Sequence, residues 1–88
     1  MWHTAPFYIF RERRRQVWVE RIYLTVRGPE GEALLRELEQ PRLRAALYDL
    51  LRQETEDPEG GLRRELSRLL GPEAERRVTL SRAFLLGP

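Results

Sequence analysis

The sequence predicts an α+β fold in which helices cover one face of a small sheet, giving a two-layer sandwich. Three patterns predict it. Aromatic and β-branched residues fill the first part of the chain, leucines recur at helical spacing in the middle, and an apolar run alternates with period two at the end. We expect a β-hairpin, then two to three helices, then a C-terminal strand. A chain of 88 residues has room for one domain, residues 1–88, with a thin core.

The first predicted element is the β-hairpin. Its strands cover Phe7–Phe10 and Val17–Val26, and the polar segment Arg11–Gln16 joins them by a connection longer than the tightest turns. Near the middle of the second strand the apolar side chains change face. We therefore predict a β-bulge at Glu20 and Arg21, which would bring both halves of the strand onto one face.

The helices are predicted from leucine spacing. Leucines three and four residues apart mark Glu32–Gln53, and Pro41, which suits the first turn of a helix, divides this segment into two helices or kinks one. A further helix is expected over Leu62–Leu70, after a loop at Glu54–Gly61. The last strand, Val78–Leu86, is apolar on both faces apart from an arginine, which is typical of a central strand.

Composition limits the location and origin of the protein. All 16 basic residues are arginine, and lysine, asparagine and cysteine are absent. This composition is typical of a thermophile, and a GC-rich genome would also favour arginine over lysine. No stretch approaches the ~18 apolar residues that span a bilayer. We expect no membrane insertion by this chain and a cytoplasmic location, provided that the chain is complete. The net charge of +2 argues only weakly for a polyanionic partner.

The residues that catalysis and metal binding need are scarce. His3 is the single histidine and lies near the N-terminus, where chains are usually poorly ordered. His3 is therefore the one histidine that could act as a general base for Ser67 or Ser81, so nucleophilic catalysis by either serine is not expected. The acidic loop Glu54–Gly61 lacks the spacing of a calcium loop, and no phosphate-loop motif occurs. We expect no enzyme activity, no metal site and no cofactor.

The hairpin carries the candidate partner-binding residues, which are four arginines and two aromatic residues: Tyr8, Arg11, Arg13, Arg14, Arg15 and Trp18. In a nucleic-acid site the arginines would contact phosphates, the aromatic rings would stack on bases, and Arg76 and Arg77 would adjoin them. Against this, Glu12 interrupts the run, and a hairpin connection is polar in any case.

A protein interface is the hypothesis that we favour for the same residues. A domain this small cannot easily bury every aromatic side chain, so Trp2, Phe7, Tyr8 and Trp18 are candidates to face a partner. Aromatic residues with arginine are typical of interface centres. We predict a non-enzymatic interaction module that forms a homo-oligomer or binds another protein, with nucleic-acid binding by the hairpin as the alternative.

The order of elements resembles the soluble C-terminal domain of the flagellar basal-body-associated protein FliL. Five segments carry the resemblance: "FYIF", "RIYLTV", "EALLRELEQPRLRAALYDLLRQET", "LRRELSRLL" and "RVTLSRAFLL". The resemblance implies a non-enzymatic, self-associating module of the kind that lies around the flagellar stator, related in fold to stomatin-like domains. Family members carry a transmembrane helix before this domain and an aromatic-rich closing strand, here represented only by Phe84. An excised domain or a soluble relative is therefore expected.

Overall fold

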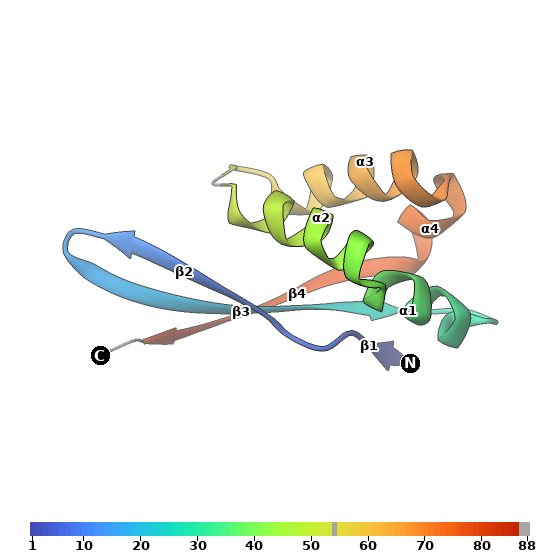
Figure 1. Ribbon diagram of the computed structural model, residues 1–88, viewed down its shortest axis with the longest axis horizontal. Coiled ribbons are helices and arrows are strands. Elements are labelled where there is room, and N and C mark those ends of the chain that lie inside the picture. Colours follow the sequence, from blue (N-terminus) through green and yellow to red (C-terminus); the bar gives the residue numbers. More distant parts are fainter. Residues whose placement is uncertain (54, 87–88) are drawn as a thin grey trace.

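The computed structural model describes residues 1–53 and 55–86, apart from the side chains of Arg13 and of residues 84–86. It confirms the predicted α+β fold: N-terminal antiparallel strands, then helices, then a C-terminal strand (Figure 1). The helices lie together on one side of the sheet (Figure 1). The elements are β1 (Trp2–His3), β2 (Phe7–Arg13), β3 (Gln16–Val26), α1 (Gly31–Glu39), α2 (Pro41–Arg52), α3 (Pro58–Leu70), α4 (Pro72–Arg77) and β4 (Val78–Leu86).

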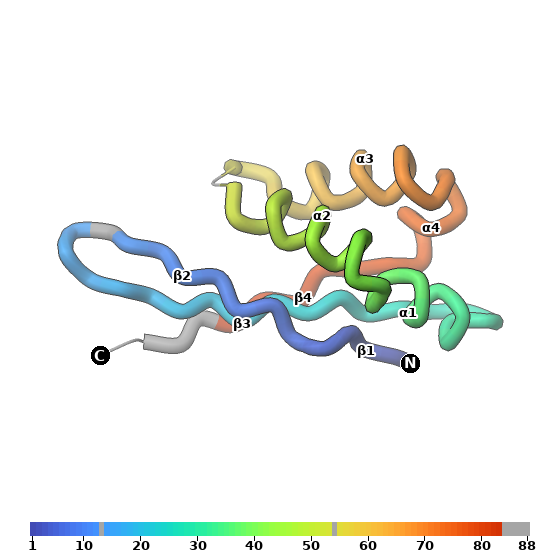
Figure 2. The backbone as a smooth tube through the Cα atoms, in the orientation of Figure 1, coloured from blue at the N-terminus to red at the C-terminus, as the bar shows by residue number. Residues whose placement is uncertain are grey.

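The long strand β3 is the centre of the sheet. At Val26 both β1 and β4 pair with β3, and at Ile22 both β2 and β4 do, so β4 lies on one edge and β1 and β2 share the other. In Figure 2 the N-terminal part of the chain runs beside β3, first as β1 and then as β2. The prediction of a central C-terminal strand was wrong. Within the described residues β4 pairs with β3 alone, because β1 and β2 already occupy the other edge.

The hairpin turn is tighter than predicted. Strands β2 and β3 extend to Arg13 and from Gln16, so only Arg14 and Arg15 form the turn. Both have positive φ, 50° and 64°, as in the type I′ turn whose twist matches that of paired strands. The prediction of a longer connection was wrong because the strands continue beyond the helix layer (Figure 1), where polar side chains are accommodated in a strand exposed to water.

The predicted β-bulge at Glu20 and Arg21 was also wrong. Strands β2 and β3 keep one unbroken register along the whole of β2. Glu20 instead lies on the same face as Ile22 and Leu24, with 0% of its surface exposed. A carboxylate is tolerated there because two arginines bind it, as described below.

One hydrophobic core lies between the sheet and the helices, and it confirms most of the leucine pattern. Its members are Phe7, Ile9, Ile22, Leu24, Val26, Leu38, Leu47, Leu51, Leu62, Leu66 and Val78. Of the four aromatic residues that were candidates to face a partner, Phe7 is buried in this core. Pro41 begins α2 directly after α1, as predicted, whereas α3 begins at Pro58, where Asp57 accepts a hydrogen bond from the Gly60 amide at 3.0 Å. No helix in the described part of the chain is long and apolar enough to cross a membrane.

Two short elements were not predicted. The first is β1, in which His3 is ordered by pairing with β3: its Nδ1 lies 3.2 Å from Thr25 Oγ1, and its ring meets the edge of Tyr23 with 5.4 Å between ring centroids. The second is α4, which follows Gly71 directly and leads into β4. Arg77, the last residue of α4, donates a hydrogen bond through Nε to the carbonyl of Arg27 at 2.9 Å. This bond fastens α4 to the end of β3.

Candidate functional site

The sheet has one face that the helices do not cover, which we call the open face (Figure 1). Side chains alternate along a strand, and Phe7 and Ile9 point into the core. The residues between them and their cross-strand partners therefore point to the open face. On β2 and β3 these are Tyr8, Phe10, Glu12, Val17, Val19, Arg21, Tyr23 and Thr25.

Four apolar side chains of the open face are neighbours across β2 and β3, and we call them the hairpin patch: Tyr8, Phe10, Val17 and Val19. Phe10 pairs directly with Val19, so their Cβ atoms lie about 5 Å apart. Phe10 is 72% exposed, Tyr8 43% and Val17 42%. Single exposed apolar residues are ordinary, but a contiguous group that includes a largely exposed phenylalanine is typical of a contact surface.

Opposite charges flank the hairpin patch. Glu12 pairs with Val17 toward the tip, and Arg21 pairs with Tyr8 on the other side. Both side chains are exposed. Glu12 lies opposite Val17, four residues from Arg21 along β3. At a rise of about 3.3 Å per residue, the two charges are about 13 Å apart along the strand. They are too far apart to neutralise each other within one chain, so both remain available to a partner.

The outer edge of β2 is partly closed by α2. The Tyr48 hydroxyl accepts a hydrogen bond from the Tyr8 amide at 3.1 Å and donates one to the Tyr8 carbonyl at 3.2 Å. Arg44 donates to the carbonyls of Ala5 and Pro6 at 3.1 and 2.8 Å. A partner strand could not pair with this part of the edge without displacing both side chains. The open face is therefore more accessible to a partner than the edge of β2.

A buried ion cluster lies behind the hairpin patch, on the covered face. Glu20 Oε2 accepts a hydrogen bond from Arg11 Nε at 2.8 Å, and Glu20 Oε1 accepts one from Arg82. Arg11 also donates through Nη2 to the Leu51 carbonyl at 2.9 Å. Burial by itself raises the pKa of Glu20, but the hydrogen bonds and charges of the two arginines outweigh it, so the pKa lies below its ordinary value. The cluster ties the hairpin to β4 and α2.

The structure divides the predicted arginines between different roles. Arg11 is part of the ion cluster, which sequence reasoning missed, and Arg14 and Arg15 are exposed at the turn. The side chain of Arg13 lies outside the described part of the chain. Arg76 and Arg77 do not adjoin the hairpin arginines: α4 is at the opposite end of a molecule 43 Å long (Figure 1).

The two predicted aromatic residues do not share a surface. Tyr8 points to the open face, whereas Trp18 pairs with Arg11 and points to the covered face, where it is half-buried. Phe10, the most exposed aromatic side chain of the hairpin patch, was not predicted. The signal that could have identified it is strand alternation, which places Phe10 opposite to Ile9 once the core face is known.

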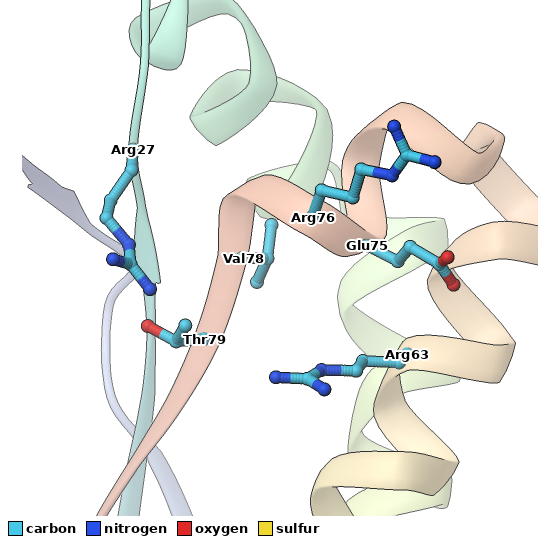
Figure 3. Close-up of a pocket in the computed structure, with 6 residues that line it drawn as sticks. All are labelled: Arg27, Arg63, Glu75, Arg76, Val78 and Thr79. Carbon is cyan, nitrogen blue, oxygen red and sulfur yellow. The ribbon is translucent and has the colours of Figure 1, made fainter.

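A second candidate site lies at the far end of the molecule. It is a pocket of about 320 Å³ lined by Arg27, Arg63, Glu75, Arg76, Val78 and Thr79 (Figure 3).

The described residues contain no group of three or more histidine, aspartate or glutamate side chains that could hold a metal ion. Glu54, part of the acidic loop, lies outside the described residues.

Comparison with family models, with curated proteins and with solved structures found no match. The resemblance to the FliL soluble domain therefore stays a prediction.

Proposed function

We propose that this protein is a non-enzymatic interaction module that self-associates through the open face of its sheet. The observation that carries the proposal is the hairpin patch, with Phe10 72% exposed at its centre and opposite charges on either side. Self-association is also what the resemblance to the FliL soluble domain implies. The partner is a second copy of the chain.

The pattern of charges favours a second copy because it is self-complementary. Two copies can stack their open faces about a two-fold axis that lies between the sheets. The axis runs perpendicular to the strands, at the level of the Phe10–Val19 pair. This axis brings Glu12 of one copy to the level of Arg21 of the other, and the reverse contact follows by symmetry. Each Phe10 then packs on the partner's hairpin patch. One contact surface supplies apolar burial at its centre and two ion pairs at its rim.

The expected dimer is weak. Burying a phenylalanine side chain contributes about 2 kcal/mol, and the two-fold axis doubles each contact. Lost translational and rotational freedom costs several kcal/mol, and the rim ion pairs are exposed to solvent and add little. Four residues a side form the apolar centre of a small interface, of the size found in transient complexes. We expect a monomer–dimer equilibrium that depends on concentration.

Sedimentation equilibrium tests the proposal. The wild type should show dimer at high micromolar concentration, and Phe10→Ser should shift it to monomer because the substitution removes the largest exposed apolar side chain of the patch. Leu69→Ser is the matched control, since Leu69 is also exposed, at 37%, but lies on α3. It should leave the equilibrium unchanged. A wild type that is strictly monomeric at this concentration removes the proposal.

Nucleic-acid binding by the hairpin tip is the second candidate function. It is favoured by the exposure of Arg14 and Arg15 on the tight turn, which projects beyond the helices (Figure 1). Phosphate contacts make log affinity fall with log salt concentration by about 0.9 per contact on duplex DNA. Arg14→Ser/Arg15→Ser should lower this slope by about two, while the control Arg42→Ser/Arg52→Ser on α2 should not. Absence of binding at low salt excludes this function.

A further inference from the structure

We propose that the pocket between the end of β3, α3, α4 and β4 binds a small oxyanion of the phosphate type. The pocket has a volume of about 320 Å³ and lies at the end of the molecule away from the hairpin tip (Figures 1 and 3). The inference does not depend on self-association, because none of the residues that line the pocket belongs to the hairpin patch or its flanking charges.

The lining of the pocket is dominated by positive charge. The lining residues include three arginines, Arg27, Arg63 and Arg76, and one acidic residue, Glu75. Within the described residues neither Arg27 nor Arg76 forms an ion pair, and Arg63 has only a long one with Glu59, 3.4 Å between Nη2 and Oε1. Like charges gathered in one pocket repel one another, and a bound anion would relieve that repulsion.

Hydrogen-bond donors line the pocket on both sides of β4. Figure 3 shows the Arg27 guanidinium beside the Thr79 hydroxyl and the Arg63 guanidinium pointing from α3 toward β4, while the Arg76 guanidinium and the Glu75 carboxylate point away. A planar guanidinium presents paired N–H donors that match two oxygens of a phosphate, and a hydroxyl donates to a third. Arg27 and Thr79 supply donors of this kind next to each other, and Arg63 adds a second guanidinium from α3. Arg76 contributes only its charge.

The walls of the pocket are held in place by Arg77. The Arg27 amide donates to the Arg77 carbonyl at 2.9 Å, and Arg77 Nε donates to the Arg27 carbonyl at 2.9 Å. Arg77 also donates to the carbonyl of Pro29. These bonds fix the end of β3 against the end of α4, so the backbones that carry Arg27 and Thr79 do not have to reorganise when an anion binds.

The volume suits a phosphate that keeps part of its hydration. A water molecule occupies about 30 Å³ in the liquid, so the pocket holds a phosphate with several waters. Because the arginines are exposed, binding should be weak and should weaken further with salt. A free phosphate and a phosphate monoester share the chemistry that the pocket recognises.

Titration of the full chain with inorganic phosphate tests the inference. The titration is followed by amide chemical shifts at pH 8, with ionic strength held constant by sodium chloride. We expect saturable shifts around Arg27 and Thr79. Arg27→Ser/Arg63→Ser should weaken binding about tenfold or more, since charge-assisted hydrogen bonds are lost. The matched control is Arg42→Ser/Arg64→Ser, which removes the same charge and includes the neighbour of Arg63 on α3, and it should weaken binding far less.

A variant that binds phosphate more tightly distinguishes loss of the site from loss of folding, because an unfolded variant cannot gain affinity. Glu75→Gln removes the carboxylate of the pocket and should tighten phosphate binding severalfold. Glycerol 3-phosphate is titrated in parallel, and the tighter of the two ligands identifies a free ion or a monoester as the preferred form. Equal weakening by the test and control double variants would show general attraction to a basic protein and overturn the inference. Shifts that do not saturate, together with no effect of Glu75→Gln, would overturn it as well.

Discussion

Glu20 and Arg11 meet inside the fold, with 2.8 Å between Glu20 Oε2 and Arg11 Nε, and this contact fastens the hairpin to the rest of the protein. Arg82 of β4 binds the other carboxylate oxygen, and Arg11 reaches on to the Leu51 carbonyl in α2. One buried carboxylate therefore adds a side-chain link between the hairpin, β4 and α2 to the backbone pairing of β3 with β4.

Glu20→Gln should destabilise the protein. Removing one member of a buried ion pair costs about 3–5 kcal/mol, and we expect about 3 kcal/mol because the side chain of Arg82 is 37% exposed and can be rehydrated. Chemical unfolding in urea measures the change. Glu12→Gln is the control in the same hairpin, since Glu12 is exposed, and it should cost less than about 0.5 kcal/mol. Equal costs for the two variants would contradict the role of Glu20.

The stabilisation by Glu20 should be lost in acid. The pKa of Glu20 in the folded protein lies below its ordinary value of 4.5, so the carboxylate stabilises the fold fully above pH 4.5 and progressively less as pH falls through the lowered pKa. The difference in unfolding free energy between wild type and Glu20→Gln should therefore shrink in acid. Other carboxylates titrate in both proteins and cancel. A difference that stays constant or grows as pH falls would contradict the lowered pKa.

Substitutions at Arg14 and Arg15 in the hairpin turn should be able to stabilise the protein. Both residues have positive φ, a conformation that costs a residue with a side chain about 1–2 kcal/mol and that glycine and asparagine adopt more readily. Replacing the pair by Asn-Gly should stabilise the protein by about 1 kcal/mol, because this dipeptide is favoured in type I′ turns. Thermal unfolding measures the gain. A loss of stability would mean that the turn is not of this type.

A side chain at Gly31 should destabilise the protein modestly. A Cβ at this position would lie 2.6 Å from Trp2 Cε3, so Gly31→Ala must displace the Trp2 ring and weaken the pairing of β1 with β3. We expect a cost of about 1 kcal/mol, typical of a clash at the end of a short element, with a shift of tryptophan fluorescence to longer wavelength. Gly61→Ala is the matched control on α3, where the nearest atoms lie at 3.9 Å. It should instead stabilise by about 0.5–1 kcal/mol.

The helices and the position of the hairpin could be predicted because their signals are local. Leu47 and Leu51 are one helical turn apart, and Pro41 marks a helix start whatever packs against it. The final strand was predicted from the alternation of residues between Val78 and Leu86, but its place at the edge depends on which other strands pair with β3. That is a property of the whole topology and has no local signal.

The position of Glu20 at the centre of the hairpin could not be predicted, because the arginine of β4 that binds its carboxylate is distant in sequence. A glutamate in an apolar stripe indicates a bulge unless cations reach it, and Arg82 lies 62 positions further along the chain. The tight turn was missed because Arg14 and Arg15 are not typical turn residues. Tyr8 was predicted as a contact residue, but Phe10 was not, since the helices alone decide which face of an apolar strand is covered.

Charge reversal across the proposed two-fold axis tests self-association through the open face most directly. Sedimentation equilibrium is measured for Glu12→Arg alone, for Arg21→Glu alone and for an equimolar mixture of the two. Each variant alone would bring like charges together and should dimerise more weakly than the wild type, whereas in the mixture every facing pair is opposite in sign and dimerisation should recover. The double variant Glu12→Arg/Arg21→Glu should also dimerise. Equal association by the single variants and their mixture would contradict the account, because Glu12 and Arg21 would then not face each other across the dimer.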